Sequence, residues 1–150
     1  MPIYLEDLSP GMVFRAGPVE VSEAEIIAFA SRYDPQPFHI DPEAAKQNPI
    51  FRGLAASGWH TAAMTMRMVV DAMRDFAGGT IGGGGDLQWT KPVRPGDLLR
   101  LEIEVLEVAP SRSKPERGSA LMRNVTYNQN DEPVQTFTVR TVVPRRPPSG

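Results

Sequence analysis

The sequence places one long amphipathic helix directly before a half that reads only as β-strand. Apolar residues at positions 59, 62, 63, 66, 69, 70, 73 and 76 follow the spacing of a single helix face. Gly78-Gly79 then provide a stop signal. We therefore expect a helix over residues 58–77, and its alanines and methionines indicate near-complete burial.

The residues after Thr80 have the β-branched content and the alternation that are typical of strands. The predicted strands are DLQWTKPV, DLLRLEIEVLEV, SALMRNVTYNQ and PVQTFTVRTVV. Turn-forming residues or a polar loop separate them, which indicates about four antiparallel strands. The long helix is the one element large enough to cover a face of their sheet. The predicted fold class is therefore α+β, with an antiparallel sheet wrapped around a long central helix.

Smaller elements are expected in the N-terminal third. The stretch DLSPGMVFRAGPVEV reads as a turn followed by an extended segment. Ser22, with a glutamate three residues later, forms a capping-box pattern that predicts a helix over residues 23–32. Pro35 disfavours helical backbone at the residue before it, so this helix should end there. Asp41, followed by a proline, should then cap a short helix, PEAAKQ.

The composition excludes several classes of protein. The net charge of −2 argues against a nucleic-acid binder, and the absence of cysteine excludes disulfides and thiolate chemistry. The N-terminus has acidic residues and no apolar core, and the longest apolar stretch is too short to span a membrane. We expect a cytoplasmic protein that forms one domain over residues 1–150, with a solvated tail at 144–150.

The stretch SRYDPQPFHIDP, residues 31–42, holds a carboxylate and one of only two histidines five residues apart. In a structural reading, Asp34 satisfies amide groups of a loop and His39 packs beside Phe38. In a functional reading, the prolines keep the segment out of a helix and fix the geometry of two groups that transfer protons. The residues alone leave both readings open.

A second motif, AASGWHT, lies at the expected start of the long helix. The first amides of a helix lack partners and carry partial positive charge, so they can stabilise an oxyanion. Gly58 would let a ligand approach the backbone there, although tight helix packing explains a glycine equally well. We expect His60, just inside the helix, to have a structural role.

Three stretches of the chain together resemble a known family. YDPQPFHIDPEAA, GLAASGWHTAAM and KPVRPGD are similar to the sequences of the MaoC-like (R)-specific enoyl-CoA hydratases, which have the hot-dog fold. The family pattern is an aspartate, two residues, a proline, one residue and a histidine, with an acidic residue two positions later. Asp34, Pro37, His39 and Asp41 match it, whereas Gln36 stands where the family usually has asparagine.

The resemblance implies a hot-dog homodimer that hydrates a trans-2-enoyl-CoA reversibly, or dehydrates an (R)-3-hydroxyacyl-CoA. Asp34 and His39 would hold the reacting water, and the amide of Gly58 would bind the thioester oxygen. The resemblance implies no metal and no organic cofactor. Contacts to the acyl-CoA substrate are expected from neighbouring residues in the three stretches, namely Gln36, Phe38, Ser57, Trp59 and Arg94.

Two other functions stay open. Hot-dog proteins include acyl-CoA thioesterases, which usually bring a carboxylate from the central helix or its surroundings, here Asp71 or Asp75. The second alternative is a dimer that binds acyl thioesters without turnover, and Gln36 keeps it open. The histidines lack a metal-binding spacing, and TIGGGGDLQW lacks the glycine pattern of a phosphate-binding loop. The basic residues of the loop at 110–118 are more simply explained as solvated charges than as phosphate contacts.

Overall fold

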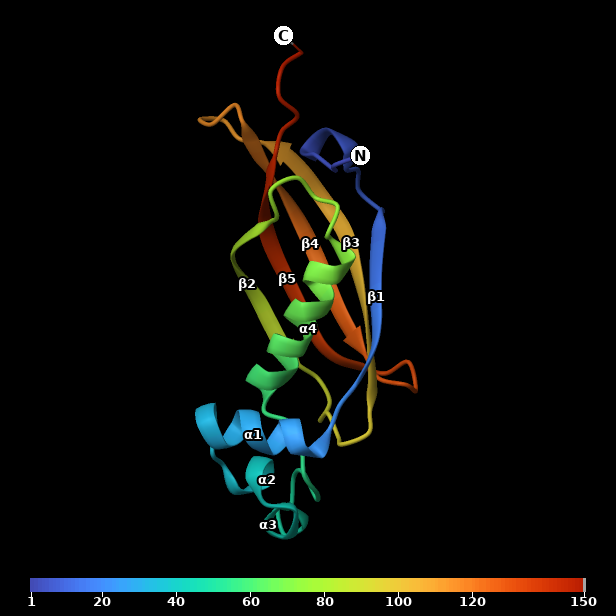
Figure 1. Cartoon of the computed structure of the whole chain (residues 1–150), viewed down its shortest axis with the longest axis vertical. Coiled ribbons are helices and arrows are strands. Elements are labelled where there is room, and N and C mark those ends of the chain that lie inside the picture. The colour runs from blue at the N-terminus through green and yellow to red at the C-terminus, as the bar shows by residue number, and fades with distance from the viewer. Residues whose placement is uncertain (150) are drawn as a thin grey trace.

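The computed structural model describes residues 1–149, and within them five antiparallel strands form one sheet in the order β1-β3-β4-β5-β2. The helix α4 (Gly58–Ala72) lies across one face of this sheet (Figure 1). The predicted α+β class, with an antiparallel sheet around one long helix, is confirmed. The strands are β1 (Val13–Glu20), β2 (Ile81–Trp89), β3 (Leu98–Pro110), β4 (Arg117–Tyr127) and β5 (Pro133–Pro144).

The sheet buries one face because its central strands alternate. In β3, Leu101, Ile103 and Val105 are buried, while the residues between them stay partly exposed. Each such side chain stabilises the fold by about 1.5–3 kcal/mol relative to an exposed one. The opposite face carries ion pairs such as Arg123 with Glu104 (3.2 Å), and an exposed pair contributes only about 0–1 kcal/mol. The core therefore lies between the apolar face of the sheet and α4.

α4 ends earlier than the sequence pattern predicted. The helix stops at Ala72 rather than at residue 77, and Met73 is its C-cap. The next residues are drawn into pairing with the N-terminal segment: the amide of Ile3 donates to the carbonyl of Asp75 (2.8 Å), and the amide of Ala77 donates to the carbonyl of Ile3 (2.9 Å). The apolar spacing continues past the helix because Met73 and Phe76, in the turn that follows it, are also buried in the core.

The near-complete burial predicted for α4 is wrong for half of its surface. Thr65 and Met68 are buried, but Trp59, Met66 and Val70 are 60%, 51% and 58% exposed. A sheet covers only one side of a helix, so the other side of α4 faces outward in the described chain. No helix among residues 1–149 has the length and apolarity that crossing a membrane requires.

Three short helices gather at the end of the sheet where α4 begins (Figure 1). They are α1 (Glu23–Tyr33), α2 (Pro37–Ile40) and α3 (Pro42–Lys46), and a single 3-10 turn, η1 (Leu5–Asp7), lies near the N-terminus. Both predicted caps are confirmed. The hydroxyl of Ser22 accepts the amide of Glu25 (3.0 Å), and the carboxylate of Asp41 accepts the first amides of α3.

The prediction for the segment of α2 was wrong, because the prolines were expected to keep it out of a helix. Pro37 is the first residue of α2. Proline is well suited to that position because its fixed φ is helical and a first-turn amide needs no partner. The amide of His39 donates to the carbonyl of Gln36 (2.9 Å). A helical turn, not a stiff loop, therefore sets the direction of His39.

Candidate active site

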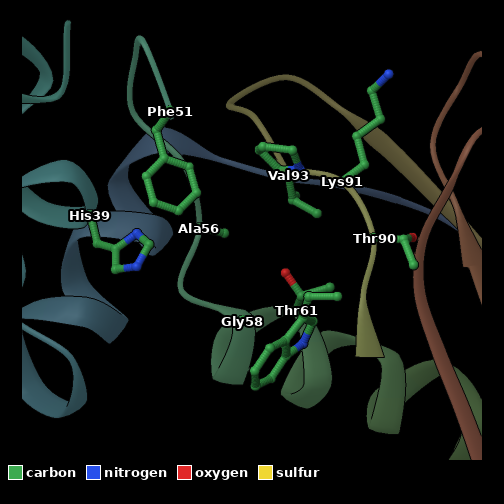
Figure 2. Close-up of a pocket in the computed structure, with 10 residues that line it drawn as sticks. His39, Phe51, Ala56, Gly58, Thr61, Thr90, Lys91 and Val93 are labelled. Carbon is green, nitrogen blue, oxygen red and sulfur yellow. The ribbon is translucent and has the colours of Figure 1, made fainter. Parts of the chain in front are cut away.

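A cavity of about 260 Å³ lies beside the start of α4. Figure 2 shows His39 and Phe51 on one side of it, Lys91 on the other and Gly58 below. The three stretches that the sequence analysis singled out therefore meet at one place. The lining residues are His39, Phe51, Ala56, Gly58, Thr61, Trp89, Thr90, Lys91, Pro92 and Val93.

Asp34 closes α1 and is held against the start of α4. Its amide donates to the carbonyl of Ala30 (2.8 Å), and its backbone then leaves the helical region, as the following proline requires. Its Oδ2 accepts the hydroxyl of Ser57 (2.7 Å). Ser57 is fully buried and also caps α4, because its Oγ accepts the amide of Trp59 (3.3 Å). One serine thus joins the carboxylate to α4.

His39 is 5% exposed, and its ring is fixed from two sides. Nδ1 lies 2.6 Å from the carbonyl oxygen of Ala55. A carbonyl can only accept a hydrogen bond, so Nδ1 carries the proton and the neutral ring presents the lone pair of Nε2. Nε2 lies 3.5 Å from Oδ2 of Asp34. The rings of Phe38 and Phe51 pack around the imidazole, with centroids 4.6 and 5.7 Å away.

Gly58 is the first residue of α4, where the helix itself offers no partner for the amide. A Cβ atom at this position would lie 2.5 Å from the ring of Trp89, closer than real Cβ atoms come. The indole of Trp89 is held in place, because its Nε1 donates to Oε1 of Gln135 (3.0 Å). The tight packing that the sequence analysis weighed for Gly58 is therefore present, and Gly58 also lines the cavity. Its role as an oxyanion donor stays a prediction.

The five expected substrate contacts lie around the cavity that the described residues form, not on its lining. Gln36 is exposed at the N-cap of α2, and Phe38 packs behind the cavity against Phe51. Trp59 is exposed and meets Trp89 edge to face. Ser57 is buried as described above, and the guanidinium of Arg94 donates to backbone carbonyls of the loop before α4. Contact between these residues and substrate stays a prediction.

The sequence analysis missed several residues of the cavity wall. Phe51 lies in no recognised pattern, and only the fold brings it here; Thr61 ends the motif AASGWHT but was not named as a candidate. Lys91 is the charged side chain of the lining and belongs to the stretch KPVRPGD, so a signal for it existed. Its ammonium pairs with Glu132. The pKa of that carboxyl is held below its ordinary value by Lys91 first and then by Asn128.

His60 follows Gly58 by two residues and faces away from this chemistry, toward α1. It is 6% exposed and its ring stacks on Phe29, with centroids 4.8 Å apart. Nδ1 has no hydrogen-bond partner among the described residues. Burial lowers the pKa of His60 below its ordinary value, and the charge of Glu25 opposes this in part. The structural role expected for His60 agrees with this position.

The arrangement suits acid–base chemistry on a carbonyl compound. With the imidazole neutral, Oδ2 of Asp34 and Nε2 of His39 are two acceptors 3.5 Å apart, so one water molecule that donates to both would satisfy them. Gly58, at the positive end of a helix, lines the same cavity as His39. Within residues 1–149, no group of three or more acidic or histidine side chains is arranged to hold a metal ion.

Comparison with known sequences gives a family match over most of the chain. A family model described as "MaoC like domain" matches residues 7–126. The chain is 34% identical to the uncharacterized protein YdeM of Bacillus subtilis, over 85% of this chain and 89% of that protein. It is 28% identical to the 3-hydroxybutyryl-CoA dehydratase of Methylorubrum extorquens, over 75% of this chain and 69% of that protein.

Solved structures give the same picture at the level of the fold. The crystal structure of a MaoC-like dehydratase from Rhodospirillum rubrum superposes with a TM-score of 0.93 and 49% identity, covering 97% of this chain and 99% of that one. The (R)-hydratase PhaJ1 from Pseudomonas aeruginosa, in its unliganded form, superposes with a TM-score of 0.78 and 25% identity, covering 99% of this chain and 96% of that one.

Proposed function

This chain belongs to the MaoC-like domain family, and we propose that it adds water reversibly to a trans-2-enoyl-CoA to give an (R)-3-hydroxyacyl-CoA. The family and the hot-dog fold that the sequence predicted are confirmed. The similarity to a 3-hydroxybutyryl-CoA dehydratase supports the same reaction here, read in the direction of water loss. The cytoplasmic location stays a prediction from the sequence.

In the proposed reaction, Asp34 and His39 hold one water between them. The pair takes a proton from this water as its oxygen bonds to the β-carbon, and the double bond shifts its electrons toward the thioester. The thioester oxygen gains negative charge, which the amide of Gly58 stabilises. A proton returned from the pair to the α-carbon completes the product. One water is consumed, and the two side chains end as they began.

The geometry around His39 is the observation that carries this proposal. Its Nδ1 is committed to the carbonyl of Ala55 (2.6 Å), so Nε2 is left as a base directed at the carboxylate of Asp34. A structural histidine of this kind would ordinarily satisfy both nitrogens with permanent partners. Here the second nitrogen meets another acceptor at 3.5 Å, a pairing that becomes favourable when a donor such as water joins it.

The thioesterase alternative expects one carboxylate, from Asp71 or Asp75, and the positions of both give it less support. Asp71 is bonded to Arg67 (3.3 Å) on the outward side of α4, and Asp75 is exposed in the turn beyond the helix. Neither lines the cavity at the start of α4. A panel of coenzyme A thioesters with short, branched and dicarboxylic acyl groups tests both functions, since hydration removes the enoyl absorbance whereas hydrolysis releases a free thiol.

Lys91 would meet the anionic part of coenzyme A by exchanging its exposed partner Glu132 for a phosphate. Figure 2 shows its side chain extending away from His39 and Gly58. Replacing Lys91 with alanine should raise KM for an enoyl-CoA about 2- to 5-fold, the amount that one exposed ion pair contributes, with kcat unchanged. An enoyl-pantetheine, which lacks the nucleotide phosphates, should show no rise.

A lysine elsewhere provides the control for that measurement. Lys46 pairs with Glu43 on α3 and does not line the cavity, so Lys46→Ala should leave KM for both substrates unchanged. Equal rises in KM for the CoA and pantetheine substrates would show that Lys91 shapes the cavity instead of reading the phosphates.

We also propose that the chain forms a homodimer through an outward apolar patch. The patch consists of the exposed large apolar side chains of α4 and β2, namely Trp59, Met66, Val70, Ile81 and Trp89. The two elements are contiguous, because Trp59 meets Trp89 at 5.0 Å. β2 is also an edge of the sheet, and a free strand edge next to exposed apolar surface favours pairing with another chain.

Charged substitutions in the patch should separate the dimer. We expect the double variant Met66→Glu/Val70→Glu to be monomeric by light scattering, while the wild type has the mass of two chains. Val13→Glu, a similar change to a partly exposed valine on the opposite edge strand β1, should stay dimeric. A wild type that is monomeric at micromolar concentration would contradict the proposal.

A further inference from the structure

The side chain of Arg94 holds the loop before α4 through several hydrogen bonds. Its Nη1 donates to the carbonyls of Gly53 (2.9 Å) and Leu54 (3.2 Å), and its Nη2 donates to the carbonyl of Phe51. Three backbone carbonyls within residues 51–54 are thus tied to one planar guanidinium. The sequence analysis expected Arg94 to meet substrate, but these donors are occupied by the protein itself.

The backbone of Arg94 is anchored as firmly as its side chain. The turn Arg94–Asp97 is closed by two bonds: the amide of Arg94 donates to Oδ2 of Asp97 (2.9 Å), and the amide of Asp97 donates to the carbonyl of Arg94 (3.1 Å). Asp97 is buried and also accepts the side-chain amide of Gln129 (3.0 Å). The guanidinium therefore projects from a fixed base formed by the sheet.

The loop that Arg94 holds leads directly into the partner of His39. Ala55 follows Leu54, and the carbonyl of Ala55 accepts Nδ1 of His39 at 2.6 Å. The amide of Ala55 donates back to the carbonyl of Phe38 (3.2 Å), and the amide of Ala56 donates to Val93, next to Arg94 (2.9 Å). Segments 51–56 and 93–94 thus form one bonded unit that presents the Ala55 carbonyl to the imidazole.

From these contacts we infer that Arg94 is a positioning residue for His39: by clamping residues 51–54 it sets the Ala55 carbonyl, and with it the ring orientation and the Nδ1–H tautomer that leave Nε2 as the base. The clamp depends on the forked, planar geometry of arginine, which lysine does not reproduce even though it keeps the charge. The expected change in kcat rests on the proposed function, whereas the expected tautomer of His39 does not.

Arg94→Lys tests this inference with two readouts. In the proposed reaction we expect kcat to fall about 10- to 100-fold from misplacement of one reacting group, with KM little changed for both enoyl-CoA and enoyl-pantetheine. In nitrogen NMR spectra, we expect the signals of the His39 ring to move away from the pure Nδ1–H tautomer. The spectra report on the clamp even if the protein hydrates no enoyl thioester.

Asn48→Ala provides an independent variant without a change of charge. Oδ1 of Asn48 accepts the amides of Ile50 and Phe51 and so holds the same loop from its other end. This variant should shift the His39 signals in the same direction as Arg94→Lys. Arg123→Lys, on the outer face of the sheet, is the matched control and should change neither readout.

The outcomes distinguish a positioning role of Arg94 from a phosphate contact. If folded Arg94→Lys and Asn48→Ala proteins both keep the wild-type ring signals, the inference is overturned, whatever happens to kcat. A rise in KM confined to the CoA substrate, with unchanged ring signals, would overturn it in favour of a phosphate contact. Changed ring signals in both variants support it.

Discussion

Replacing Asp34 with asparagine should lower kcat for hydration of a short enoyl-CoA about 10²- to 10⁴-fold, the usual effect of removing one acid–base group. Asparagine keeps the shape of the side chain and can still accept the hydroxyl of Ser57 through its oxygen. It carries no charge, so it neither orients the shared water by charge nor exchanges a proton with it. The midpoint of thermal unfolding should stay near that of the wild type, since the contact with Ser57 survives.

Asp71→Asn is the matched control for this result. The change is chemically identical, but Asp71 lies on the outward side of α4 in an exposed pair with Arg67. We expect wild-type hydration from it. The reverse pattern, with full activity in Asp34→Asn and a large loss in Asp71→Asn, would move the chemistry to the central helix and favour the thioesterase reading.

Gly58→Ala should lower kcat about 10²- to 10³-fold, the range seen when one oxyanion donor is removed. Alanine keeps the amide, so the loss comes from displacement. The added Cβ would meet the ring of Trp89 at 2.5 Å, and either the indole or the first turn of α4 must shift. Ser57, which holds Asp34, precedes Gly58 directly, so such a shift also disturbs the carboxylate.

A double variant separates this steric cause from others. Trp89→Leu removes the ring atoms that the new Cβ would meet. Gly58→Ala/Trp89→Leu should therefore be more active than the product of the two single effects predicts. Removing the ring relieves the clash that lowers activity in Gly58→Ala alone. Strictly multiplicative losses would mean that Trp89 is not what makes glycine necessary at this position.

The sequence predicted the elements of the site whose signal is local. Asp34 and His39 lie five residues apart; Asp34 directly precedes a proline, and His39 lies two residues after another one. The start of α4 was equally readable, because apolar periodicity begins there after a serine and a glycine. The antiparallel sheet was predicted from the alternation of apolar and polar residues in the C-terminal half. Such alternation gives the sheet one apolar face, which another layer must cover.

Contacts between distant parts of the chain were not predictable in this way. The bond from Ser57 to Asp34 joins residues 23 positions apart, and the contacts from Arg94 span 40 or more. Arg94 was expected at the substrate because it belongs to the stretch KPVRPGD, and nothing local in the sequence reveals its bonds to distant backbone carbonyls. α2 was missed for the opposite reason: proline was taken as a helix breaker where it begins a helix.

The most direct test of the account follows the oxygen of the reacting water. Purified protein would be incubated with a short trans-2-enoyl-CoA in water enriched in heavy oxygen, and the products analysed by mass spectrometry. We predict that the label enters the β-hydroxyl group of an intact 3-hydroxyacyl-CoA, and that Asp34→Asn forms almost none of it. Label found instead in a free carboxylic acid, with coenzyme A released, would contradict the account.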